Sequence, residues 1–579
     1  MEIIGEKEVP SDSQPTQITN FPREILVRIL QQLKAADLLQ CTKVCRAFRD
    51  VVGSCEVQYK LEVEYAGMED GDDVETPITD RLQALRDYED GWSTATFHRQ
   101  PTSDPAAASA NSASTHVRGI SFLGSVIPTL VGTDLRLLRP SSPLRRIAER
   151  RWTIPLAELG IVPDFCSVDL SQDLVVVSGH RGDRSMACYL LSLNAGGRAL
   201  GHPLARLSPY TYSRSYESVG ETTMKASVHE DLVGWLIRET FVPDGSACTL
   251  MIYNWKTGTR ILHIRPSPQL TFSFLGHCAL AVGYEDEVDL YILCPSSHAT
   301  DIQVAQRICT LRFPELSDPM NQLNIHALAL QIPRTSRYDH GCLFRPDPES
   351  AVLAVDFGIY DMDADLVGTF ALFVPLSSLL GLVDAYAPKV RPTTNEGAFA
   401  PSSSRDAWGS KDGDIRIFSW DAWAGKSARL VRFQHGHSFM SAFGSKCAMA
   451  FTGSLSDPCR VDTFVFDVRR WTHAPPSRCN RGDDGDLQHA SQFFSCVDSS
   501  MVGGEADVFA GIAGTLTRSD LRIRVRHKHF ECDNVISPFV AAAQSHWLAL
   551  VEDGLAYMYL NPENAVDARG PTAHYSFSV

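Results

Sequence analysis

The sequence lacks any pair of cysteines at C-x-x-C spacing, although it contains 15 cysteines in 579 residues. They are scattered singly, mostly inside apolar segments, which is typical of buried free thiols in a reducing compartment. The sequence also lacks an apolar run long enough to cross a membrane, and residues 1–14 are acidic where a signal peptide would be basic and then apolar. We therefore expect a protein of the cytosol or the nucleus.

Positive charge is scarce. The chain has 53 lysines and arginines against 69 aspartates and glutamates, which gives a formal net charge of −16. This balance argues against a general affinity for nucleic acid or for an anionic membrane, because both need a basic surface. The hydrophobic content of 44% and charged content of 21% are those of a soluble globular protein, and the length predicts two or more structural units.

Three short helices are predicted within residues 18–53. Pro22 suits the first turn of a helix, and Asp37 with Gln40 three residues later is a variant of the capping box that starts a second helix. The third helix is predicted from about residue 42, with Gly53 as its stop. The first helix carries one broad apolar stripe, formed by Ile25, Leu26, Ile29, Leu30 and Leu33.

A unit of this size buries too little surface to be stable without a staple, a metal or a partner. No metal pattern is present, so a partner protein is expected. The residues that carry the pattern resemble the F-box, with Phe21 where that family usually has Leu and Phe48 where it often has Trp. They are Phe21, Pro22, Glu24, Ile25, Leu26, Ile29, Leu30, Leu33, Asp37, Leu38, Leu39, Cys41, Val44, Cys45, Arg46, Phe48 and Arg49.

The resemblance implies binding to the Skp-family adaptor of a cullin-based ubiquitin ligase, and through it to the cullin. The alternative is an ordinary three-helix core fragment, since amphipathic helices are common. The sequence does not separate the adaptor-facing residues from those that pack the helices together. The set expected to face the adaptor is Pro22, Ile25, Leu26, Ile29, Leu33, Leu38, Leu39 and Val44.

Residues 54–98 are expected to form a helical connector, with helices over 56–66 and 78–92. They resemble the connector that follows the F-box in a large set of fungal proteins, and a connector of fixed shape would set the distance from ligase to substrate. The matching residues are Ala66, Gly67, Asp70, Gly71, Arg81, Leu82, Leu85, Tyr88 and Trp92. Residues 1–17 are predicted to be disordered, and the small, polar residues 99–116 to form a low-complexity linker.

Short apolar runs separated by turn residues fill residues 117–579, which predicts an all-β domain. Strand, loop, strand units recur about every 40 to 60 residues, the spacing of propeller blades. One hairpin, with Gly258 in its turn, resembles half of a WD-repeat blade. The expected fold class is thus α+β multidomain: an all-α F-box and connector followed by a degenerate propeller of about seven blades. A two-layer sandwich is the alternative.

The sequence offers little for catalysis or for cofactor binding. A nucleophile elbow is absent, and the His435/His437 and His527/His529 pairs have no further ligands at metal-binding spacing. We therefore expect no enzyme activity, no cofactor and no metal.

One basic ladder stands out in this acidic chain. Arg522, Arg524 and Arg526 alternate with apolar residues on a predicted strand, and arginine forks suit the capture of an acidic or phosphorylated target. The simpler interpretation is an outer strand that its charges protect from edge pairing.

Together these features predict a non-catalytic substrate receptor of a cullin ubiquitin ligase, which binds the adaptor through its F-box and a target protein through its propeller. Two alternatives stay open. One is a scaffold that holds the adaptor without ubiquitin transfer, and the other is a propeller enzyme or small-molecule binder, which would need convergent carboxylates or a metal in its central channel.

Overall fold

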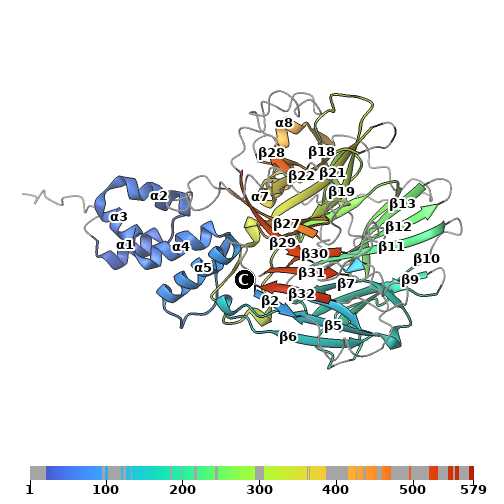
Figure 1. Ribbon diagram of the computed structural model, residues 1–579, viewed down its shortest axis with the longest axis horizontal. Coiled ribbons are helices and arrows are strands. Elements are labelled where there is room, and N and C mark those ends of the chain that lie inside the picture. Colours follow the sequence, from blue (N-terminus) through green and yellow to red (C-terminus); the bar gives the residue numbers. More distant parts are fainter. Residues whose placement is uncertain are drawn as a thin grey trace, which may run out of the picture.

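The computed structural model has helices at its N-terminal side and a ring of β-sheets beyond them (Figure 1). Residues 1–17 and 102–116, predicted to be disordered and a linker, lie outside the described residues. The structure describes residues 18, 21–93, 98–101, 119–120, 126–131, 133–182, 185–196, 198–213, 218–241, 245–293, 305–361, 363, 366–386, 415–424, 427–433, 439–452, 460–470, 494–496, 521–531, 546–551, 554–559 and 573–578.

Five helices open the chain: α1 (Arg23–Leu30), α2 (Ala35–Val44), α3 (Arg46–Val52), α4 (Cys55–Tyr65) and α5 (Ile78–Ser93). The predicted capping box is wrong, because α2 begins at Ala35 and Asp37 lies within its first turn. The Ala35 N–H donates to Glu64 Oε2 of α4 at 3.0 Å, a distant partner that no local pattern reveals. Val44 ends α2 and does not belong to α3.

Six sheets of four or five strands form the blades of a propeller, and this confirms the predicted all-β architecture in place of a sandwich. Three are β2 (His98–Pro101) with β30 (His546–Val551), β31 (Gly554–Tyr559) and β32 (Ala573–Ser578); β3 (Gly119–Ile120) with β7 (Val162–Asp169), β8 (Leu174–His180), β9 (Ser185–Ser192) and β10 (Tyr210–Ser213); and β11 (Ser218–His229) with β12 (Leu232–Phe241), β13 (Gly245–Asn254) and β14 (Thr259–Ser267).

The other three blades follow in chain order. They are β15 (Thr271–Gly276) with β16 (Ala279–Gly283), β17 (Glu287–Leu293), β18 (Ala305–Arg312) and β23 (Arg416–Phe418); β19 (Gln322–Ala329) with β21 (Val352–Tyr360), β22 (Leu366–Pro375), β24 (Arg429–Phe433) and β28 (Phe494–Cys496); and β25 (Phe439–Phe443) with β26 (Lys446–Thr452), β27 (Arg460–Arg470) and β29 (Leu521–Glu531). Two short helices, α7 (Leu376–Tyr386) and α8 (Trp420–Trp423), lie in the connections.

The described strands form six blades, where the sequence predicted about seven. A further sheet has three described strands, β4 (Ile127–Val131), β5 (Asp134–Arg139) and β6 (Arg150–Pro155), and packs on the apolar face of β7–β9. Spacing along the chain counts strand pairs, and it does not show whether a pair gains a third or a fourth strand.

Successive blades pack face to face, and the apolar layers between them form the core of the domain. Each layer draws on two neighbouring sheets, as between β7–β10 and β11–β14. The middle strands are buried on both faces: every residue of β16, and all but the last residues of β8 and β21, are buried. This explains their continuous apolar sequences.

The propeller ring joins segments from both ends of the chain. β2 pairs antiparallel with β32, so that His98 lies opposite Ser578. The chain therefore enters the propeller at residue 98, inside the predicted connector and before the predicted propeller boundary at residue 117. Long-range strand pairing of this kind leaves no local signal in the sequence.

Helix α4 joins the first helices to the propeller. Val57 and Leu61 pack with the cores of α1, α2 and α3, whereas Tyr59 and Val63 pack with α5 and with Phe344 of the propeller. Residues two apart lie about 200° apart around a helix, so α4 buries two opposite faces. Polar bonds reinforce α4: Arg86 of α5 forms a bidentate pair with Glu62, with Nη2 to Oε1 at 2.7 Å.

The segment between α4 and α5 is bound to the propeller along its length. β1 (Met68–Asp70) pairs with β20 (Phe344–Pro346), and Arg81 forms an ion pair with Asp70. The Tyr59 Oη lies 2.8 Å from Asp70 Oδ1 and 3.0 Å from the Leu343 carbonyl oxygen. Burial raises the pKa of the Tyr59 hydroxyl, so it stays a donor at neutral pH.

Gly71 marks the closest approach of this segment to the propeller. Its N–H donates to the Leu343 carbonyl at 3.0 Å, and a Cβ at this position would lie 2.0 Å from the Cys342 carbonyl oxygen. The clash involves backbone, which cannot move aside as a flexible side chain would. The contact thus requires glycine for its lack of a side chain.

We predict that Gly71→Ala loosens the junction and lowers the free energy of unfolding by about 2 kcal/mol or more, the usual cost of forcing atoms into a packed site. Urea denaturation of the full chain measures this. Gly201→Ala is the matched control, since nothing lies within 4 Å of its added Cβ and the change should be nearly neutral. Equal stabilities of the two variants would contradict the role assigned to Gly71.

Candidate functional site

The first candidate site is an exposed apolar strip on α1 and at the end of α2. The side chains of Ile25, Ile29 and Val44 are 41%, 37% and 67% exposed, although helix cores normally bury such residues. They are exposed because the inner side of α1 is already filled. Leu26 and Leu30 turn inward against Val51, Val57 and Leu61.

The structure therefore divides the predicted adaptor-facing set. Pro22, Ile25, Ile29 and Val44 are exposed, Leu33 and Leu39 are half-buried, and Leu26 and Leu38 are buried in the helical core at 4% and 0% exposure. In this structure the side chains of Leu26 and Leu38 hold the three helices together, and adaptor contact by the set stays a prediction. A helical stripe of apolar residues does not reveal which of its edges faces the core.

Two exposed apolar residues extend the strip, and the sequence-based set missed them. Ile18 is 45% exposed and Phe21 is 42% exposed, beside the start of α1. Phe21 was recognised only as part of the family pattern. The sequence did hold a signal for the exposure of Phe21. A large apolar residue directly before the N-cap has no preceding helical turn that could cover its side chain.

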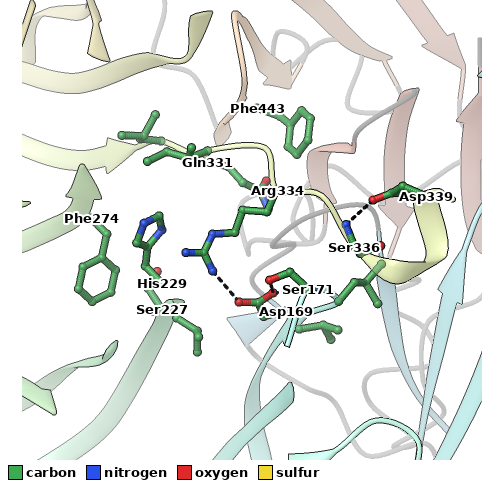
Figure 2. Close-up of a pocket in the computed structure, with 15 residues that line it drawn as sticks. Asp169, Ser171, Ser227, His229, Phe274, Gln331, Arg334, Ser336, Asp339 and Phe443 are labelled. Carbon is green, nitrogen blue, oxygen red and sulfur yellow. Dashed lines mark hydrogen bonds and ion pairs between the residues drawn. The ribbon is translucent and has the colours of Figure 1, made fainter. Parts of the chain in front are cut away.

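The second candidate site is a polar pocket at the axis of the propeller, with a volume of about 90 Å³ (Figure 2). It lies near the C-terminal ends of β7, β11 and β15, and the connection that follows β19 crosses it. Figure 2 shows the Arg334 guanidinium reaching from this connection toward Asp169, with His229 and Phe274 on the opposite side. The volume suits a few waters and falls below that of a typical ligand pocket.

The carboxylates of the axial pocket are already engaged. Asp169 Oδ2 accepts from Arg334 Nη1 at 3.0 Å, and its Oδ1 accepts from the Ser171 hydroxyl at 2.5 Å. Asp339 accepts from the Ser336 N–H at 2.6 Å and forms an ion pair with Arg139. The pocket therefore presents neutralised acids rather than the convergent free carboxylates that a propeller enzyme would need.

No group of three or more potential metal-ligating side chains occurs among the described residues. His435 and His437 lie outside them, as do the side chains of His527 and His529. No described helix is both long and apolar enough to span a membrane.

The basic ladder lies on β29. This strand is the outermost of its sheet and pairs only with β27 among the described strands, with Arg524 opposite Asp467 and Arg526 opposite Val465. An outer position agrees with the protective interpretation. The side chains of Arg522, Arg524 and Arg526 are outside the described part of the structure, so target recognition by this ladder stays a prediction.

Helices that expose an apolar strip, joined to a β-propeller, are thus the class of protein that fold and surface define. The family model described as F-box-like matches residues 18–57, so the chain carries an F-box-like domain at its N-terminal side. No curated protein matches the chain.

Two solved structures resemble the chain weakly. The WD40 domain of SCAP from fission yeast is 8% identical, with a TM-score of 0.31, and the match covers 79% of this chain and 80% of that one. The β-propeller domain of Cps50 (Swd1) from Myceliophteria thermophila is 10% identical, with a TM-score of 0.22, covering 44% and 77%. The propeller assignment rests on the strand pairing and not on these likenesses.

The axial pocket generates one prediction. Burial, and then the nearby Arg334 charge, lower the pKa of His229 to about 3 from an ordinary 6.5. The unfolded chain takes up this proton below pH 6.5, whereas the folded chain does so only near pH 3. The contribution of neutral His229 to the free energy of unfolding is therefore complete above pH 6.5. It is lost as the pH falls from 6.5 toward 3, at up to about 1.4 kcal/mol per pH unit.

We predict that His229→Gln flattens the acid limb of the stability curve. Between pH 7.5 and pH 5, wild type should lose about 2 kcal/mol more than the variant. Urea denaturation at the two pH values measures this difference, and identical pH slopes would contradict the burial of a neutral imidazole.

Proposed function

We propose that this protein is a substrate-recognition subunit of an SCF-type cullin ubiquitin ligase. The observation that carries the proposal is the exposed apolar strip of Phe21, Ile25, Ile29 and Val44, on a domain whose own core is complete without them. Exposed apolar surface that no intramolecular packing requires favours a protein partner. The F-box-like match over the same residues supports a Skp-family adaptor as that partner.

The division between surface and core refines the proposed adaptor contact. Pro22, Ile25, Ile29 and Val44 would touch the adaptor directly, with Leu33 and Leu39 at the margin. Leu26 and Leu38 would act by holding α1 and α2 in place. In this proposal the protein contributes no catalytic group, and it accelerates ubiquitin transfer by holding a target near the charged carrier enzyme.

The docking of the connector supports this role. Through α4 and the segment after it, the helical unit is attached to the propeller by apolar packing, by pairing of β1 with β20 and by the Asp73–Arg146 ion pair at 2.7 Å. A target held on the propeller would therefore stand at a defined position relative to the adaptor. A flexible tether would give a lower effective concentration.

We predict that Ile25→Asp combined with Ile29→Asp weakens binding to a purified Skp-family adaptor at least tenfold, since both changes place charge in a desolvated contact. Thermal unfolding should stay near wild type, because both side chains are exposed in the free chain. Calorimetric titration measures the affinity, and cullin recruitment in the same preparation separates a ligase subunit from a scaffold.

Val74→Asp with Leu204→Asp is the matched control. Both side chains are exposed, at 88% and 59%, and neither belongs to the cluster in which α1 packs. The control adds the same two negative charges as the α1 variant. Adaptor affinity equal to that of wild type is expected for the control. Full adaptor binding by the α1 variant would remove the proposal.

A further inference from the structure

A second and much wider cavity lies beside the axial pocket, between α7 and the turns around the propeller axis. We call it the α7 groove, and its volume is about 770 Å³, within the range of ligand sites. Ser171, His229, Ile332 and Arg334 line both cavities, so Arg334, central in Figure 2, forms part of the wall between them.

The α7 groove has an apolar floor. Helix α7 contributes Leu376 and Leu380, four residues apart on one side. Leu376 is buried in the core between blades together with Leu379 and Val383, whereas Leu380 is half-buried and open to the groove. Ile332 on the facing connection is half-buried. Such a floor would take one or two apolar side chains from a partner.

Carboxylates dominate the rim of this groove. Arg334 is already matched by Glu230 of the rim at 2.9 Å and by Asp169 of the axial pocket at 3.0 Å, and Asp231 is paired with Lys256 at 2.5 Å. The groove also holds the exposed imidazole of His277 and the buried His229, whose lowered pKa keeps it neutral.

Two rim carboxylates stand apart from these pairs. Glu349 and Asp384 are exposed, and neither has an ion-pair partner within the described part of the chain. They lie on opposite elements, Glu349 on the turn before β21 and Asp384 on α7. Their charges give the groove a net negative rim, which complements a cationic segment.

The groove is continuous with the junction that holds the F-box-like domain. The Asp347 N–H donates to the Gly67 carbonyl at 3.0 Å and the Ser350 hydroxyl donates to the same oxygen at 3.2 Å. Pro348 and Glu349, between these two contacts, line the groove. A segment in the groove would thus lie next to the connector.

We propose that the α7 groove binds an extended basic segment of the target protein, with apolar side chains on the Leu380 and Ile332 floor and lysine or arginine side chains at Glu349 and Asp384. The identification of the occupant as a target rests on the proposed ligase function. The preference of the groove for a basic, apolar segment does not rest on that function, because the preference follows from the rim charges and the apolar floor alone.

The test uses the full chain and a fluorescein-labelled 12-residue peptide that alternates lysine with leucine. Two companion peptides replace every lysine with glutamate or every leucine with serine. Fluorescence anisotropy at two salt concentrations measures the dissociation constants. We expect the lysine–leucine peptide to bind at least tenfold more tightly than either companion, and its binding to weaken as salt increases.

Glu349→Lys combined with Asp384→Lys should weaken binding of this peptide at least tenfold. Glu158→Lys with Glu315→Lys is the matched control, because it changes the net charge equally at exposed positions outside both cavities. Glu349→Gln with Asp384→Asn serves if the lysine variant does not fold, and it should weaken binding in the same direction.

Four results would overturn the inference: equal losses in the rim and control variants, preference for the glutamate peptide, equal binding of the serine peptide, or a dimer of this chain that the peptide displaces. Failure of the ligase proposal is distinguishable. Peptide binding that survives in a chain unable to bind the adaptor leaves the groove intact, whereas adaptor binding without peptide binding overturns the groove alone.

Discussion

The structure depends on one helix that is buried on two opposite sides. α4 has 11 residues, and Val57 and Leu61 on one side complete the core of the first three helices. Tyr59 and Val63 on the other side are part of the cluster with α5 and the propeller. Because any rotation of α4 would expose one set or the other, the apolar strip on α1 has a fixed orientation relative to the propeller.

One connection in the propeller contributes to the axial pocket, to the junction with the connector and to the α7 groove. Residues 330–351, between β19 and β21, place Arg334 and Asp339 at the axial pocket, pair β20 with β1, and present Glu349 to the α7 groove. The Arg334–Asp169 and Asp339–Arg139 ion pairs anchor this segment where it crosses the axis. A buried ion pair adds little net stability, but breaking it is costly, so such pairs fix position more than they stabilise.

The sequence predicted the elements well and their assembly less well. Apolar runs such as residues 352–357 identified strands because both faces of these strands are buried, and helix periodicity located α4 and α5. Predictions from local patterns were wrong where a contact with a residue far along the chain sets the structure. Glu64 sets the start of α2, pairing between distant strands sets how many strands each described sheet holds, and β32 draws residue 98 into the propeller.

The same distinction applies to the sites. The α1 stripe was visible, but Ile25 and Leu26 are neighbours whose exposures differ tenfold, at 41% and 4%, because Val57 and Leu61 cover only one of them. The α7 groove gave no signal at all, because its walls come from one helix and from turns scattered between residues 171 and 384. The acidic surroundings of the groove are visible only in three dimensions: at Asp347, directly before the groove-lining Pro348, burial raises the pKa of the carboxyl group, and the charges of Glu349, Glu69 and Glu64 raise it further. Such repulsion beside a junction costs stability in the free chain, and a bound cationic segment would relieve it.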